Sequence, residues 1–248
     1  IAGIKPEIID LKYLYVEVDT SVYYNSNSVS DTTELITSVT KALTSYSRSS
    51  DINDFGGRFK YSKIVGLIDA SARGVTSNIT KVKMRRDIAP ELNTFATYEL
   101  CYGNAFYEQP NGYGVRSSGF TVSGIDGVLY LGDIPTSGTT VGKLVFFKLV
   151  NNIPLIVKND AGTVDYLHGE INLDVVNITG AMLESGLIEV EAIPDSNDII
   201  ALKDLYLQLD VSNSTVNALP DVVSSGENTS ATSYVTTSSY ASESIYTR

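Results

Sequence analysis

Residues 13–25 read YLYVEVDTSVYYN, and this stretch decides how the first third of the chain folds. Its even positions carry mainly aliphatic side chains from Leu14 to Val22, whereas its odd positions carry tyrosine, acidic or hydroxyl side chains. Successive side chains of a strand point to opposite faces. The alternation therefore predicts a strand over 11–24 that buries its even face in a core.

A helix is expected next, over residues 31–47. Asp31 is followed three residues later by Glu34, which is the spacing of a capping box that satisfies the first free backbone N–H groups. Apolar residues then recur at helical spacing from Leu35 to Tyr46. The pattern predicts an amphipathic helix that packs one face on the strand before it.

A second, shorter helix is expected beyond the loop at 47–57, which holds two adjacent glycines. Ser62 is a candidate N-cap, and apolar residues between Ile64 and Ile68 share one face. Gly74 suits the left-handed residue that commonly ends a helix.

The strand expected over 78–88 contains KVKMRRD at 81–87, the one basic cluster of the chain. Val82 and Met84 face one side of this strand, and Lys81, Lys83 and Arg85 face the other. Such a row is typical of a solvated strand face. The sharper hypothesis is a salt-bridging site for an acidic partner.

The pattern changes from about residue 94 onward. Short apolar or alternating runs are separated by Gly, Pro, Asn and Asp, which predicts antiparallel β structure in a sandwich or barrel-like sheet. The runs are TFATYELCY, GVLYLG, KLVFFKL, IPLIVK, EINLDVVNI, LIEVEAI and LYLQLDV. GAMLESG at 180–186 is a short helical candidate.

The predicted fold class is α+β, in three parts. Residues 1–92 form an N-terminal strand-helix-helix-strand module with its helices on one face of a small sheet. Residues 93–223 form a mainly antiparallel β domain. Residues 224–248 form an extended Ser/Thr/Tyr-rich tail, which buries too little apolar area to order alone and is expected to be mobile or to pair with another chain.

Composition excludes several classes of function. The chain has 248 residues, with 29 acidic against 18 basic residues and a formal charge of −11, which argues against nucleic acid and anionic membranes as partners. One Cys and one His exclude an internal disulfide and a closed structural zinc site. The apolar runs are too short for a membrane-spanning helix. Because the chain begins with Ile1, we expect a fragment or a processed product.

Each candidate for catalysis has a simpler structural interpretation. His168 with Asp165 and a serine is one hypothesis, but no nucleophile-elbow motif is present, and GTVDYLHGEINL is typical of a turn between two strands. Cys101 lies in an apolar run without basic neighbours. Glu189 and Glu191 form the paired acids that a glycosidase needs, but acid pairs are common in so acidic a chain. We expect no catalytic residue, cofactor, metal or small-molecule substrate, and no pocket of convergent titratable groups.

The first third resembles the baseplate J-like family of contractile-tail phages. The resemblance is carried by four stretches: the strand YLYVEVDTSVYYN, the capped helix DTTELITSVTKALTSY, the segment DFGGRFKYSKIVGLIDAS, and the strand RGVTSNITKVKMR. The family often has Pro-Gly-Val where this chain has Arg73-Gly74-Val75. The remainder of the chain resembles the family only in its general pattern, a long β-rich part with a Ser/Thr/Tyr-rich end. The motifs are signatures of the fold and contain no catalytic residues.

What the resemblance implies is architectural. A member would be a structural, non-enzymatic late protein of the virion tail baseplate, assembled in the host cytoplasm, of which this chain is the C-terminal part. It would form a homodimer, join a ring of dimers around the tail tube, bind other baseplate wedge subunits and relay the trigger of sheath contraction.

Two questions stay open from the sequence. Tyr13, Tyr15 and Tyr23 on the odd face of the first strand are candidates for a protein interface, because tyrosine gives large contact area at a low entropy cost. Alternatively, they cover this face of the sheet against the C-terminal part. The competing functions are a β-rich receptor- or glycan-binding module of a phage fibre or cell surface, and a glycoside hydrolase.

Overall fold

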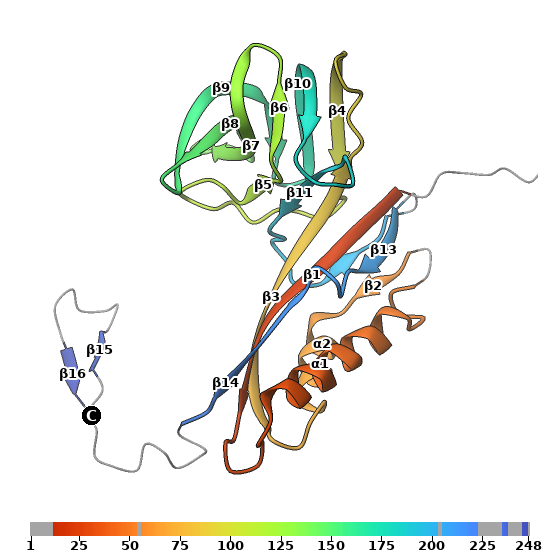
Figure 1. The fold of residues 1–248 in the computed structure, drawn as a ribbon, viewed down its shortest axis with the longest axis vertical. Helices are drawn as coiled ribbons and strands as arrows, with labels where there is room; N and C mark the ends of the chain where they lie inside the picture. The colour runs from red at the N-terminus through yellow and green to blue at the C-terminus, as the bar shows by residue number, and fades with distance from the viewer. Residues whose placement is uncertain (1–11, 54–55, 203–204, 223–234, 238–244, 248) are drawn as a thin grey trace, which may run out of the picture.

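The computed structural model describes residues 12–53, 56–202, 205–222, 235–237 and 245–247. It is mainly β sheet, with two helices among the described residues. A long ribbon extends from a β-barrel, and both helices lie along the ribbon (Figure 1).

The ribbon consists of β1 (Lys12–Tyr24) and β3 (Val75–Ile88), which pair antiparallel along most of their length. The even residues of β1 from Leu14 to Val22 are buried, as the alternation predicts. Their partners on β3 include Met84 and Val82. One polar pair lies in this face, where the hydroxyls of Thr20 and Thr80 are 2.8 Å apart and satisfy each other.

Helix α1 (Thr32–Ser47) begins as the sequence predicts, because the Asp31 side chain accepts a hydrogen bond from the Thr33 backbone N–H at 2.7 Å. Its buried residues recur at helical spacing and pack over the even face of the ribbon; they are Leu35, Val39, Leu43 and Tyr46.

Helix α2 (Tyr61–Asp69) differs from the sequence prediction at its N-cap and at Gly74. Lys60 is its N-cap, and Ser62 lies inside the first turn. Gly74 lies five residues beyond the helix and outside the left-handed region. A glycine fits there because the backbone lies close to Val29: an added Cβ would be 2.2 Å from a methyl of that residue, too short for a real contact.

The far edge of β1 is completed by strands from the end of the chain. β13 (Leu205–Leu209) pairs parallel with the first half of β1, and β14 (Thr215–Pro220) pairs parallel with the second half. Two shorter strands, β2 (Arg58–Phe59) and β12 (Ile199–Ile200), pair beside the helices. The sheet of the first third therefore depends on residues about 200 positions away, which periodicity could not reveal.

The barrel contains every β run that the sequence predicts between residues 94 and 193. Its strands are β4 (Phe95–Cys101), β5 (Val115–Ser117), β6 (Phe120–Val122), β7 (Ile125–Pro135), β8 (Val141–Val150), β9 (Ile153–Asp165), β10 (Glu170–Ala181) and β11 (Ile188–Ala192). The pairings β7–β6, β6–β10, β10–β9, β9–β8 and β8–β7 close a ring. Residues 180–186 form no helix, because β10 continues to Ala181 and a turn follows.

One sheet runs through the expected boundary at residue 92. β3 pairs with β1 in its first part and with β11 at its end, so the ribbon and the barrel share a strand ladder. The division into parts at 1–92 and 93–223 stays a prediction. Most of the predicted tail lies outside the described residues, within which Val235–Thr237 and Ile245–Thr247 pair antiparallel.

Candidate protein interface

The register of the ribbon brings the candidate residues onto one face. Directly opposite pairs on this odd face are Tyr15 with Arg85, Glu17 with Lys83, and Asp19 with Lys81. Acidic side chains of β1 thus face basic side chains of β3 across the two strands. We call this side of the ribbon the open face, because both helices pack on the even side; its candidate residues are Tyr13, Tyr15, Tyr23, Lys81, Lys83 and Arg85.

Two of the three tyrosines form an aromatic cluster at one end of the open face. The rings of Tyr13 and Tyr15 stack with centroids 5.8 Å apart, and Tyr206 of β13 meets Tyr13 edge-on. The Arg85 guanidinium lies 4.5 Å from the Tyr15 ring centroid. Burial raises the pKa of the Tyr15 hydroxyl, with a further contribution from Asp87. Both tyrosines are half-buried and packed within the chain.

Tyr23 lies at the other end of β1, separated from this cluster. Its neighbours on the open face are Ser77 of β3 and Leu219 of β14. Ile79, two residues further along β3, is 58% exposed and Leu219 is 40% exposed. We call this patch, made of Tyr23, Ser77, Ile79 and Leu219, the distal patch.

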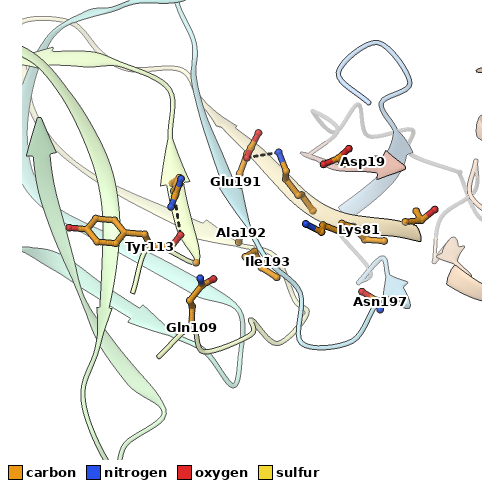
Figure 2. Close-up of a pocket in the computed structure, with 13 residues that line it drawn as sticks. Asp19, Lys81, Gln109, Tyr113, Glu191, Ala192, Ile193 and Asn197 are labelled. Carbon is orange, nitrogen blue, oxygen red and sulfur yellow. Dashed lines mark hydrogen bonds and ion pairs between the residues drawn. The ribbon is translucent and has the colours of Figure 1, made fainter. Parts of the chain in front are cut away.

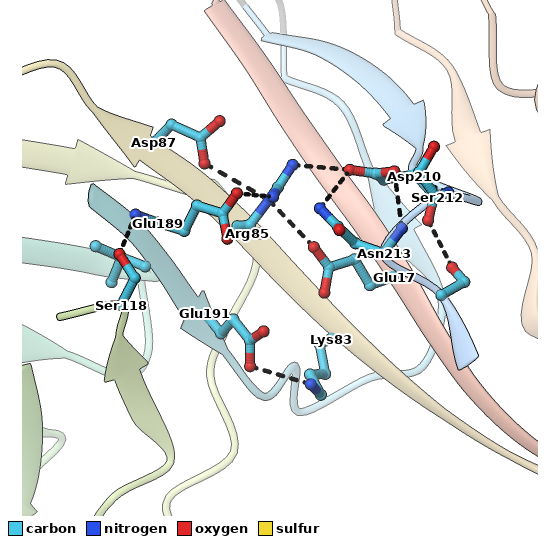
Figure 3. A network of polar contacts seen from close by, with 12 residues as sticks. Glu17, Lys83, Arg85, Asp87, Ser118, Glu189, Glu191, Asp210, Ser212 and Asn213 are labelled. Atoms are coloured by element: carbon cyan, nitrogen blue, oxygen red, sulfur yellow. Dashed lines mark hydrogen bonds and ion pairs between the residues drawn. The ribbon is translucent and has the colours of Figure 1, made fainter. Parts of the chain in front are cut away.

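Arg85 differs most from its sequence interpretation. Its side chain is 5% exposed and is surrounded by four carboxylates (Figure 3). Its Nη1 donates to Glu189 at 2.5 Å and its Nη2 donates to Asp210 at 2.8 Å. Its Nε lies 3.1 Å from Glu17 and 3.5 Å from Asp87. Arg85 is therefore the centre of a buried network that we call the Arg85 network.

The network holds more negative charge than its single guanidinium neutralises. Burial raises the pKa of Glu17 from 4.5 to about 7, against the opposing effect of Arg85. Burial also raises the pKa of Asp87 and of Glu189. The Asp210 carboxylate has additional partners, because it accepts hydrogen bonds from the backbone N–H groups of Ser212 and Asn213.

Sequence reasoning missed the role of Asp210, which lies 125 positions from Arg85 with no local pattern to mark it. It weighed Glu189 and Glu191 as a catalytic pair or a solvated face, and the structure shows a third arrangement. Glu189 bonds to Arg85, and Glu191 pairs with Lys83 at 3.1 Å. The signal available was the alternation of acids on 187–193 against that of bases on 81–85, which suits two neighbouring strands.

A groove of about 510 Å³ lies where the ribbon meets the barrel (Figure 2). Lys81 and Asp19 line it from the ribbon, and Gln109, Tyr113 and Ile193 line it from the barrel side. Its lining also includes Lys83, Glu191 and Arg116. This groove corrects the expectation that no pocket gathers titratable groups.

The other catalytic candidates lie apart from the groove. His168 Nδ1 is 2.8 Å from Asp165 in the turn between β9 and β10, and hydrogen bonding to Asp165 raises the pKa of the imidazole. No serine hydroxyl of the described residues bonds to that ring. Cys101 is a half-buried free thiol, 3.9 Å from a Glu170 oxygen.

No helix in the described part of the chain is long and apolar enough to cross a membrane. No group of three or more His, Cys, Asp or Glu side chains in the same residues is arranged to hold a metal ion.

Residues 12–87 match the family model of baseplate structural protein gp6, C-terminal domain III. The match begins at the first residue of β1 and ends next to the last residue of β3, so it covers the ribbon with its two helices. It supports a phage baseplate wedge protein family and, with it, a structural role in the virion tail baseplate. None of the curated proteins matches the chain. Membership of the J-like family stays a prediction.

Proposed function

We propose that this chain is a structural, non-enzymatic part of the large baseplate wedge subunit of a T-even-type contractile-tail phage. The observation that carries the proposal is the match of residues 12–87 to a baseplate structural domain, because this range includes β1, both helices and nearly all of β3. In that segment the even face is covered by helices, and the part of the open face outside the Arg85 network is left for other contacts.

The proposed homodimer forms through the distal patch. Ile79 and Leu219 offer exposed apolar area there, and Tyr23 adds an aromatic side chain of the kind enriched at interfaces. A stable interface of this kind needs more than about 1,000 Å² in total. The three paired strands β14, β1 and β3 form one continuous face for such contact.

The dimers are proposed to join into a ring around the tail tube and to bind other wedge subunits through the rest of the open face. The ribbon is well suited to relay a contraction trigger, because one continuous ladder from β14 through β1 and β3 to β11 connects the distal patch to the barrel. A push on one end would be transmitted along hydrogen-bonded strands rather than through a flexible linker.

The first experiment is light scattering on a size-exclusion column over a range of concentrations. We expect a mass near twice that of one chain, whereas a strict monomer at high concentration would contradict the dimer. A second experiment mixes the chain with purified baseplate wedge proteins and measures complex formation. Absence of any complex, together with saturable binding on a glycan array, would replace this proposal with the receptor- or glycan-binding module.

A further inference from the structure

The groove follows a free edge of the sheet. β11 pairs with β3 from Ile88 to Met84, and its last paired residue, Ala192, is opposite Met84. Residues 80–83 of β3 line the groove immediately beyond that point. Among the described residues, this part of β3 has β1 on one side and no strand on the other.

Backbone groups at this edge point into the open side. The Thr80 carbonyl accepts a hydrogen bond from the Tyr61 hydroxyl at 2.9 Å, so it is directed away from β1. Alternate residues of a strand direct their N–H and C=O groups to the same side. The N–H and C=O of Val82 are therefore directed away from β1 as well, and outside the β1–β3 ladder the described residues provide them with no hydrogen bond.

Cationic side chains lie on both walls beside this edge. Lys81 makes no ion pair with any described residue, and Arg116 donates only its Nε, to the Tyr113 carbonyl at 3.1 Å. Lys83 is already neutralised by Glu191. Asp19 lies opposite Lys81 on the neighbouring strand and also lines the groove. With Lys81, Lys83 and Arg116 against Asp19 and Glu191, the lining keeps an excess of positive charge in a chain with a formal charge of −11, which favours an anionic partner.

The barrel wall of the groove is held in a costly conformation. Tyr113 has φ +63°, a left-handed conformation that is rare for a large side chain. Its N–H donates to the Asp133 carbonyl at 2.9 Å. The Asp133 carboxylate is buried and accepts from the Val115 N–H at 2.7 Å and the Tyr166 hydroxyl at 2.6 Å. Strain that is maintained in this way is typical of functional sites.

We propose that this groove binds an extended acidic segment of another protein chain, which adds to β3 as a strand. Free backbone groups on β3 favour an extended occupant, because strand addition supplies them with partners. Lys81 and Arg116 favour carboxylates on it, and the rigid wall at Tyr113 leaves the groove ready to receive it. The inference deepens the proposed function, since it states what kind of partner segment the baseplate subunit would take.

The test uses fluorescent peptides of about ten residues and the chain as it exists. An alternating Glu-Thr peptide is the probe, an alternating Lys-Thr peptide is the charge control, and an alternating Glu-Pro peptide keeps the charge but lacks half of the N–H donors. We expect saturable binding of Glu-Thr, binding of Glu-Pro that is about tenfold weaker or more, and none of Lys-Thr. Absence of saturable Glu-Thr binding, or equal binding of Glu-Pro, would overturn strand addition.

Variants then locate the site. The double variant Lys81→Glu, Arg116→Glu is expected to weaken Glu-Thr binding about tenfold or more, whereas Lys41→Glu on the exposed side of α1 should leave it unchanged. Equal binding by both variants would place the peptide elsewhere and contradict the proposal. Thermal unfolding verifies that each variant folds. A dimer in light scattering without peptide binding would refute this inference alone, and the proposed function would stand.

Discussion

The Nε atom of Arg85 lies 3.1 Å from an Oε atom of Glu17, yet neither atom makes a hydrogen bond. The two groups attract by charge, whereas the hydrogen bonds of the guanidinium run from Nη1 to Glu189 and from Nη2 to Asp210. Both side chains are buried. The attraction within a buried ion pair compensates poorly for the hydration that its two charges lose. Because protonation removes the charge of the carboxylate, the effect of this pair on stability depends on pH.

Replacing the arginine should expose the cost of the crowded carboxylates. We expect Arg85→Met to destabilise the fold by about 3–5 kcal/mol near pH 8, because removal of one partner leaves buried charges unpaired. The loss should shrink near pH 5, where Glu17, whose pKa burial raises to about 7, binds a proton. Urea unfolding at both pH values measures it. Arg73→Met, at an exposed position without an ion pair to any described residue, is the control, and an equal loss at both pH values would contradict the explanation.

Glu17→Gln should stabilise the fold at high pH. Burial raises the pKa of Glu17 from 4.5 to about 7, so the folded state binds a proton more tightly than the unfolded state. Stability is then fully present below about pH 4.5 and is lost as the pH rises through about 7. The glutamine imitates the protonated acid and should gain about 1–3 kcal/mol at pH 8.

The same variant should flatten the decrease in stability between pH 4.5 and 7, which thermal unfolding across that range would reveal. Glu99→Gln, at an exposed position of β4, is the matched control and should keep the wild-type dependence. An unchanged slope in Glu17→Gln would show that Glu17 titrates normally.

Local patterns predicted local structure well. Alternation at 13–25 and the Asp31 cap gave β1 and α1 correctly, because each depends on residues within one element. The short apolar runs likewise gave the strands between 94 and 193. The pairing of β13 and β14 with β1 could not be predicted, since it depends on tertiary contacts across most of the chain.

The candidate site shows the same division. The sequence placed Lys81, Lys83 and Arg85 on one strand face, which the ribbon register supports. The sequence could not show which of these three side chains is buried and which is exposed. Arg85 is buried because β11 and the turn after β13 bring Glu189 and Asp210 to it, whereas Lys81 stays at the groove. The interface role of all six candidate residues stays a prediction.

The buried Asp133 should make Tyr166 important to the barrel. Tyr166→Phe removes the hydroxyl that donates to the Asp133 carboxylate at 2.6 Å, and hydrogen bonds to charged groups contribute about 1.5–3 kcal/mol. We expect a loss of that size in urea unfolding. Tyr130→Phe, on the neighbouring β7, removes a hydroxyl without a hydrogen bond to any described residue and should cost much less. Equal losses would show that packing, not the hydrogen bond, dominates.

The distal patch should respond to charge. Ile79→Glu places a carboxylate at the centre of the proposed dimer interface, where burying an unpaired charge is unfavourable. We expect the dimer to dissociate at concentrations where the unchanged chain is dimeric, as measured by light scattering. Ile153→Glu, on an apolar residue of the barrel that is 68% exposed, should leave the dimer intact. Dissociation by both variants would mean that charge, not position, is responsible.

We expect the turn at His168 and Gly169 to depend on the backbone of Gly169 more than on the side chain of His168. Gly169 has φ +67°, and an added Cβ would lie 1.9 Å from the Asn104 carbonyl oxygen. Its own carbonyl accepts from the Tyr102 N–H at 2.8 Å. Gly169→Ala must therefore move backbone that holds this turn against the barrel, and we expect a loss of more than about 1 kcal/mol.

His168→Ala should change stability little, because its imidazole is exposed and its pairing with Asp165 is screened by solvent. Thermal unfolding of the two variants side by side gives the comparison. A glycine variant as stable as the unchanged chain would show that the backbone relaxes freely at this turn. A large loss in His168→Ala would instead make the His168–Asp165 pair a structural element of the turn, since the imidazole contributes to its stability only through that contact.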